Sequence, residues 1–172
     1  MSIVPPLATI PVGVIVERSK SANPWADFYW RAVSVLTGQP DTPAWTKLSD
    51  DGARTTFYAG TAEIELYRTE TTYYRHNLES GAPALWVALR AVDSDPPFTV
   101  SAVTADPAEG ESFTETAMDL VEQVPMPQAI LRAVTAFVAE HHVEQPFVKR
   151  KRDRADPEAL AHRPHRLGDD GE

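Results

Sequence analysis

Apolar and polar residues alternate with a period of two over several stretches in the first third of the chain. The β-branched alternation in residues 10–17 predicts a first strand, and the apolar run 28–36 predicts a second. Residues 45–48 and 54–59 are short strand-like runs joined by Ser49-Asp50-Asp51-Gly52, whose Asp-Gly step supplies the positive φ that a tight turn needs. These two runs are therefore expected to form a β-hairpin.

Strand periodicity continues further along the chain. Ala59-Gly60 predicts an interruption, after which residues 61–68 alternate between apolar and polar side chains, so that one face meets the core and the other meets water. Residues 85–90 and 98–102 alternate in the same way around a turn at 93–97 and predict a second hairpin. Residues 118–124 are expected to be a short strand or an extended segment.

Helical patterns are fewer. Thr69 is a plausible N-cap for a helix over residues 70–79, and an acidic stretch starting near Pro107 predicts a weak helix at most, because it contains Gly110 and has no apolar stripe. The clearest helix follows Pro127 and is expected to dock on the sheet. Its apolar stripe recurs at helical spacing and consists of Ile130, Leu131, Val134, Phe137 and Val138.

Together these elements predict an α+β fold. We expect a mainly antiparallel curved sheet or half-open barrel of about six to eight strands, with one mid-chain helix and a C-terminal helix packed on it. Residues 1–8 are interpreted as an N-terminal extension and residues 9–154 as a single α+β domain. Residues 155–172 are mostly polar and predict a disordered tail.

The composition excludes several kinds of functional site. The chain has 172 residues, of which 42% are hydrophobic, and it has no cysteine, which excludes disulfides, thiolate metal sites and thiol nucleophiles. The first ten residues have no basic region and contain Pro5 and Pro6, so no signal peptide is predicted. The apolar runs are shorter than the roughly 20 residues that a membrane-spanning helix needs. A cytoplasmic protein without a membrane partner is expected.

The charges are unevenly distributed along the chain. Residues 149–172 hold seven basic and six acidic residues, whereas residues 1–148 hold nine basic and nineteen acidic ones, a net charge of −10. Such a field repels nucleic acids and anionic membranes, so neither is an expected partner.

No catalytic, cofactor or metal site is predicted. The chain contains no phosphate-binding Gly-rich loop and no nucleophile elbow. His141 and His142 adjoin Glu140, but consecutive helical residues point about 100° apart and do not converge on a metal. Glu63 and Glu65 share one strand face and could act as paired carboxylates, although solvated strand faces usually have this composition.

Residues 24–31 concentrate four aromatic side chains in one short segment and allow two interpretations. Two or three of the rings could close one end of the sheet core, because large aromatics dominate core burial. Alternatively, Trp25, Trp30 and Arg31 could be exposed anchors for a protein partner, since Trp and Arg dominate binding hot spots.

A basic run follows the last predicted helix and also has two interpretations. It could be a solvated extension, or it could bind phosphate or an acidic partner protein. The run consists of Lys149, Arg150, Lys151 and Arg152, followed by Asp153 and Arg154.

Three stretches resemble a proteobacterial family of unknown function. They are residues 9–18 (TIPVGVIVER) with Pro24, Trp25 and Trp30, residues 58–70 (YAGTAEIELYRTE), and the segment from Val124-Pro-Met-Pro127 to Arg154. Members of that family tend to be encoded beside formate dehydrogenase genes, and some are labelled automatically as molybdopterin-guanine dinucleotide biosynthesis protein A. That label implies a Gly-Gly-x-Ser-x-Arg-x-Gly loop after the first strand, where this chain has VGVIVERSK.

The resemblance implies a role in molybdoenzyme assembly. The favoured hypothesis is a non-catalytic accessory protein that binds a formate dehydrogenase subunit or a maturation factor. One alternative is an enzyme that handles molybdopterin or guanine nucleotides. Another is a domain that holds a small apolar ligand in a cavity lined by Trp86, Tyr58 and Phe57. An exposed sheet edge could also make a homodimer.

Overall fold

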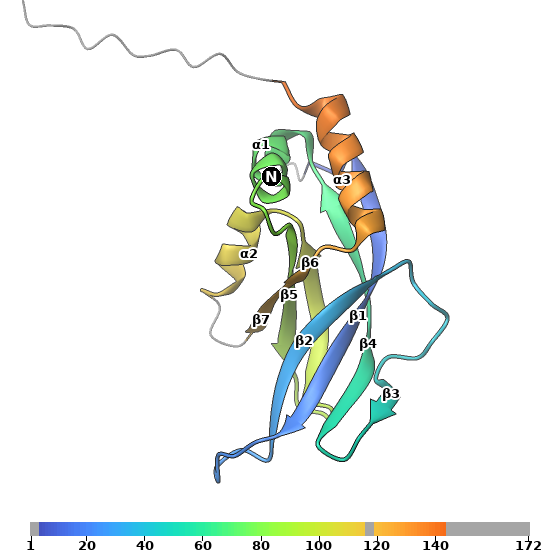
Figure 1. Cartoon of the computed structure of the whole chain (residues 1–172), viewed down its shortest axis with the longest axis vertical. Helices are drawn as coiled ribbons and strands as arrows, with labels where there is room; N and C mark the ends of the chain where they lie inside the picture. The colour runs from blue at the N-terminus through green and yellow to red at the C-terminus, as the bar shows by residue number, and fades with distance from the viewer. Residues whose placement is uncertain (1–3, 116–118, 144–172) are drawn as a thin grey trace, which may run out of the picture. The chain divides into compact units, whose positions relative to one another are not determined.

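The computed structural model describes residues 4–115 and 119–143, and these form antiparallel sheets and helices (Figure 1). The elements in chain order are β1 (Ala8–Lys20), β2 (Phe28–Thr37), β3 (Thr46–Asp50), β4 (Arg54–Leu66), the 3₁₀ turn η1 (Arg68–Glu70), α1 (Thr71–Leu78), β5 (Ala84–Ala91), β6 (Phe98–Thr104), α2 (Pro107–Phe113), β7 (Asp119–Pro125) and α3 (Gln128–His141). The predicted α+β class and antiparallel pairing are confirmed.

The strands form two sheets rather than one. The first has the order β2-β1-β4-β3 and the second β6-β5-β7, and within the described residues no ladder of hydrogen bonds joins them. β4 lies beside β6, and β2 beside β7, so the two sheets face each other as the walls of an unclosed barrel. The hydrophobic core lies between them.

One apolar cluster fills the space between the sheets. Strand β1 contributes Val12, Val14 and Val16 on its inward phase, and β5 contributes Leu85, Val87 and Leu89. The stripe of α3 completes the cluster, as the sequence predicted, with Ile130, Val134, Phe137 and Val138 buried and Leu131 partly buried. Burial of apolar surface of this kind is the main stabilising term of the fold.

Two local predictions were wrong. The expected interruption at Ala59-Gly60 does not end the strand, because Gly60 adopts φ 143° at an irregularity and β4 continues to Leu66. Thr69 does not cap a helix: it lies inside η1, and α1 begins after Glu70 without a side-chain cap. Glycine tolerates the backbone that a bulge requires, which explains the first error.

The helix at Pro107 has a side-chain cap and a close packing contact that its composition does not indicate. Asp106 caps it by accepting hydrogen bonds from the backbone N–H groups of Ala108 (2.8 Å) and Glu109 (3.4 Å). Gly110 lets the helix approach Trp86, since a Cβ atom there would lie 2.2 Å from the indole ring. The structure thus contains the helix expected near Pro107, as a second mid-chain helix after α1.

The helices and the hairpin turns lie at opposite ends of the sheets (Figure 1). The β1–β2, β3–β4 and β5–β6 turns share the lower end, where Phe98 at the start of β6 touches Trp30 near the start of β2. None of the described helices is long and apolar enough to cross a membrane. The predicted domain end at residue 154 and the predicted tail 155–172 lie outside the described residues.

Candidate functional site

An arginine surrounded by aromatic rings marks the lower end of the sheets. Arg18 occupies the same inward phase of β1 as Val12, Val14 and Val16, and its guanidinium carbon lies 4.3 Å from the ring centre of Phe28. The same carbon is 5.6 Å from the ring of Trp30 and 5.3 Å from that of Phe57. A guanidinium over aromatic faces makes favourable cation–π contacts, which hold the charge at the edge of the core.

Trp30 is the centre of this group of rings. Its ring centroid lies 5.9 Å from those of Phe57 and Trp45, 6.0 Å from Phe98 and 6.4 Å from Phe28. Phe98 belongs to the second sheet, so the rings join both sheets. We call this set the aromatic end; it consists of Arg18, Phe28, Trp30, Trp45, Phe57 and Phe98. Trp30 is therefore partly buried within it and is not a freely exposed anchor.

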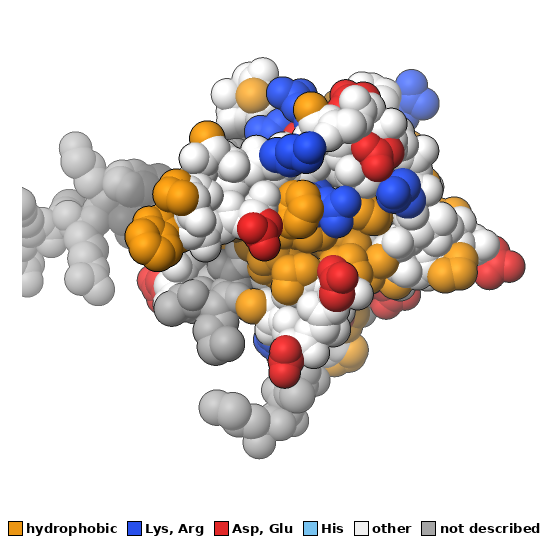
Figure 2. Space-filling view, turned by 90° about the horizontal axis from the view of Figure 1, so that it is seen from below, with side chains coloured by type: hydrophobic (Ala, Val, Ile, Leu, Met, Phe, Trp, Pro, Cys, Tyr) orange, Lys and Arg blue, Asp and Glu red, His pale blue; other side chains and the backbone are white. Residues whose placement is uncertain are grey.

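Trp25 has the opposite environment, with 92% of its surface exposed. It lies in the β1–β2 loop (residues 21–27), whose internal hydrogen bonds fix its backbone. The N–H of Trp25 donates to Asn23 Oδ1 (3.1 Å), and the N–H of Asn23 donates to Ser21 Oγ (3.0 Å). Seen from this end, apolar side chains gather in the centre of the surface with Lys and Arg beside them (Figure 2).

Arg31 lies on the outer face of the first sheet. Its Nε is 3.8 Å from a carboxylate oxygen of Glu17 on the neighbouring strand. Both residues line an open hollow of about 460 Å³, together with Ser19, Lys20, Tyr29, Ala53 and Arg54. The hollow gathers three cationic side chains and one carboxylate, which suits an anionic group.

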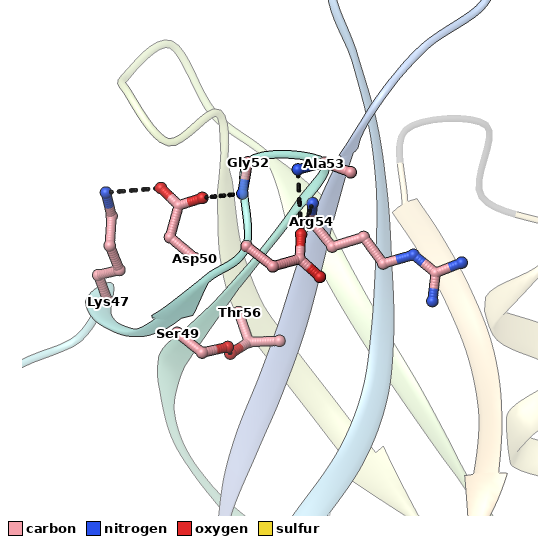
Figure 3. A network of polar contacts seen from close by, with 8 residues as sticks. Lys47, Ser49, Asp50, Gly52, Ala53, Arg54 and Thr56 are labelled. Atoms are coloured by element: carbon pink, nitrogen blue, oxygen red, sulfur yellow. Dashed lines mark hydrogen bonds and ion pairs between the residues drawn. The ribbon is translucent and has the colours of Figure 1, made fainter.

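The β3–β4 turn is fixed by two aspartates (Figure 3). Asp50 accepts from the N–H of Gly52 (2.9 Å) and from Lys47 Nζ (3.3 Å), and Asp51 accepts from the N–H groups of Ala53 (3.0 Å) and Arg54 (2.8 Å). These backbone hydrogen bonds favour the charged carboxylates and lower the pKa of each below its usual value of 3.8. The turn therefore holds the backbone of Arg54 in place above that pH.

A second, acidic hollow of about 220 Å³ lies between β4 and β6. It is lined by Glu63 and Glu65, the pair noted in the sequence, and by Glu109. The hydroxyl of Tyr67 donates to Glu65 (2.5 Å), which raises the pKa of Tyr67 to about 12. Thr104 Oγ1 donates to Glu109 (2.6 Å).

Within the described ranges, no group of three or more acidic or histidine side chains is placed to hold a metal ion.

The two neighbouring histidines turn to different partners. The ring of His141 lies 4.6 Å from that of Phe137, while His142 contacts Thr71 Oγ1 through Nδ1 (3.1 Å) and Arg75 through Nε2 (3.4 Å). These contacts join the end of α3 to α1. Both histidines therefore have structural neighbours, and their rings do not converge.

The rings suggested for an apolar cavity are packed against different groups. Phe57 stacks on Trp30, Trp86 packs on Gly110, and Tyr58 lies over Gly13, where an added Cβ would meet its ring at 2.6 Å. Tyr58 is buried, and its hydroxyl has no hydrogen-bond partner among the described residues. Burial raises its pKa. Within the described residues, each of the three rings thus packs against a different neighbour.

The β1 strand leads directly into an antiparallel hairpin with β2. A phosphate-binding loop of the kind that the transferase label implies would connect a strand to a helix. The segment after the first strand is therefore not built as such a loop.

The aromatic end is not recognisable as a unit in the sequence. The sequence pattern indicates Trp25, Trp30 and Arg31 as candidates, but not Arg18, Trp45 and Phe98. The position of Arg18 was a usable signal, because an arginine on the inward phase of a strand needs a special partner. Lys149, Arg150, Lys151 and Arg152 lie outside the described residues.

Comparison with known proteins gives a family match and nothing closer. Residues 11–151 match the sequence profile of a family described as "Protein of unknown function (DUF3305)". No curated protein and no solved structure matches the chain.

Proposed function

Because this chain belongs to the DUF3305 family, whose function is unknown, we propose a function from its own site: it is a non-catalytic accessory protein that binds another protein. The binding surface consists of Trp25 and the neighbouring aromatic end. The groups that line it are aromatic rings and cations, the types that dominate the energetics of protein interfaces.

The exposure of Trp25 is the observation that carries this proposal. An indole that is 92% exposed gives up the hydrophobic free energy that burial would supply, unless a partner covers it. Its loop is held by hydrogen bonds of its own, so little conformational entropy is lost when a partner binds. Phe28, which belongs to the aromatic end, is also exposed and adds apolar surface to this end of the molecule.

The family that the sequence resembles indicates which partner to propose. Members of that family tend to be encoded beside formate dehydrogenase genes. The proposed partner is therefore a formate dehydrogenase subunit or a maturation factor of such an enzyme. The cations around the hollow at Arg54 favour an acidic surface on that partner.

Affinity purification from a native host tests the proposal. Tagged wild-type protein is expected to recover a molybdoenzyme subunit or maturation factor, identified by mass spectrometry, and Trp25→Ala is expected to reduce that recovery about tenfold or more. Tyr73→Ala is the matched control, because Tyr73 is an exposed aromatic on α1, at the other end of the sheets. Its recovery should equal that of the wild type.

Two results would together refute the proposal. One is a purification that recovers neither class of protein, and the other is a gene deletion that leaves formate dehydrogenase activity intact. Calorimetry with GTP tests the alternative of a nucleotide-handling enzyme, because that alternative requires saturable binding of GTP by the purified chain.

A further inference from the structure

The outer face of the first sheet presents a small grid of polar side chains. Strand register places Tyr29 of β2, Ser19 of β1 and Arg54 of β4 in one row. The next row holds Arg31, Glu17 and Thr56. Directly paired residues of antiparallel strands project to the same face, so these side chains share one surface.

The hollow on this face is lined by cations that are only partly neutralised by carboxylates. Glu17 is the one carboxylate that lines the hollow, its side chain is only 16% exposed, and Arg31 already pairs with it. In the part of the chain that the structure describes, no carboxylate lies within ion-pair distance of Lys20 Nζ or of the Arg54 guanidinium. Among the described residues, Lys20 and Arg54 therefore line the hollow without an ion pair of their own.

The position of Arg54 is set by the turn before it. Its backbone N–H is held by Asp51, and its side chain extends from the turn away from Lys47 and Asp50 (Figure 3). Arg54 lines the same hollow as Tyr29 and Arg31 of β2, with β1 between them. A guanidinium positioned in this way can bind a carboxylate through two parallel hydrogen bonds.

A second hollow has Lys20 in common with the first. It has a volume of about 500 Å³ and is otherwise lined by Ser21, Asn23, Pro24, Ala26, Asp27 and Phe28. Trp25 lies in the loop that contributes most of these residues. We call the two hollows together the Lys20 track. Arg31 and Arg54 line one hollow, and the other adjoins the Trp25 loop.

We infer that the Lys20 track binds an extended acidic segment of a partner protein. Carboxylates of the segment pair with Arg54 and Lys20, and an apolar residue that follows them packs on Trp25. The inference rests on the proposed function and names the chemistry of the partner at the same surface.

The extent and charge of the track favour this ligand over others. Two hollows that share Lys20 exceed what a single phosphate or carboxylate fills, and an extended peptide can place successive side chains in both. Glu17 and Asp27 also line the two hollows, which disfavours a ligand with a negative charge at every position, such as a nucleic acid, relative to a peptide that is acidic only at some positions.

Fluorescence anisotropy with a synthetic peptide tests the inference. The probe is a fluorescein-labelled octapeptide of four glutamates followed by Gly-Leu-Gly-Leu, added to the full chain in low salt. We expect saturable binding, a Kd about tenfold or more weaker for the K20Q/R54Q double variant, and a Kd unchanged for Arg132→Gln. Arg132 is an exposed arginine on α3, so this variant loses one positive charge away from the track, where the double variant loses two.

Other outcomes of this experiment overturn the inference. They are no binding of the probe, equal binding of a peptide with glutamine in place of each glutamate, or equal losses in K20Q/R54Q and Arg132→Gln. Competition by inorganic phosphate or GTP at concentrations well below those of the peptide would assign the track to a phosphate ligand instead. Circular dichroism and urea unfolding establish that each variant is folded.

Failure of this inference is separable from failure of the proposed function. If affinity purification recovers a molybdoenzyme protein equally well with K20Q/R54Q and wild type, the partner binds, but the Lys20 track does not bind its acidic segment. If purification recovers no such protein while the peptide binds through Arg54 and Lys20, the accessory role fails and the acidic-peptide site remains.

Discussion

At the scale of single residues, the lower end of the molecule is organised by charges placed against aromatic rings. Arg18 continues the inward phase of β1 beyond Val16, where the core opens toward solvent, and the rings of Phe28, Trp30 and Phe57 surround its guanidinium. The alkyl stem of an arginine covers apolar surface while its charged group reaches water. Arg18 thus closes the core without another ring at that position.

Substituting Arg18 tests this contribution to stability. Arg18→Ala removes the cation–π contacts and the packing of the alkyl stem, so we expect the free energy of unfolding to fall by about 1–2 kcal/mol. Urea denaturation followed by tryptophan fluorescence measures the change. Arg132→Ala should stay within about 0.5 kcal/mol of the wild type, since Arg132 is exposed on α3. Equal effects of the two substitutions would refute the role of the cluster.

Tyr74 makes the stability of the fold decrease with pH in the alkaline range. The side chain is buried between the helices, and its oxygen accepts from the N–H of Tyr67 (3.0 Å). Burial raises the pKa of Tyr74 to about 12, whereas an unfolded tyrosine titrates near 10. The unfolded chain therefore loses this proton first, so the stabilisation is complete below pH 10 and is lost as pH rises toward 12.

Urea midpoints between pH 8 and pH 12 measure this loss. We expect them to decline above pH 10 for the wild type and to decline less steeply for Tyr74→Phe, which has no proton to release at this position. A remaining slope is expected from Tyr67, whose pKa is also raised to about 12 by its hydrogen bond to Glu65. Parallel profiles for wild type and Tyr74→Phe would contradict the assignment.

At the scale of elements, one buried amide joins a helix to both strands of the second hairpin. Asn77 of α1 donates through Nδ2 to the carbonyl oxygens of Ala84 (2.8 Å) and Ala105 (2.9 Å), and its Oδ1 accepts from the N–H of Ala84 (3.0 Å). These bonds satisfy backbone groups at the start of β5 and just after β6. They connect α1 to the second sheet.

We expect substitution of Asn77 to be among the most destabilising single changes near the helices. Asn77→Ala leaves one buried N–H and two carbonyl groups without a partner, so we expect a loss of about 3 kcal/mol in the free energy of unfolding. Chemical denaturation provides the measurement, and Asn23→Ala in the exposed loop provides the comparison. A loss of less than about 1 kcal/mol would show that water replaces the amide without penalty.

Local sequence patterns predicted most elements and the two hairpins β3–β4 and β5–β6, but not the contacts between the two sheets. Strand periodicity identified β1, β2, β5 and β6, and the apolar stripe identified α3, because these patterns depend on residues close in sequence. The contact between Trp30 and Phe98 joins two sheets and residues far apart in the chain, so no local pattern indicates it. For the same reason, the grouping of Ser19, Arg31 and Arg54 in one hollow required the register of three strands.

At the scale of the whole molecule, the negative charge is concentrated away from the hairpin turns. Residues 17–31, 46–57 and 89–100, which include these turns, hold six basic and six acidic residues, while the rest of residues 1–148 hold three basic and thirteen acidic ones. The proposed binding end is thus close to neutral within an acidic chain. An acidic partner is therefore expected to approach from the hairpin end, and salt should weaken its binding.

Site-specific photocrosslinking in a native host determines whether the Trp25 loop contacts another protein. A photoreactive phenylalanine analogue replaces Trp25 in one strain and Tyr73 in another, and crosslinked products are identified by mass spectrometry after irradiation. The account predicts a crosslink from position 25, and none from position 73, to a formate dehydrogenase subunit or maturation factor. Absence of any protein crosslink from position 25, or the same products from both positions, would contradict it.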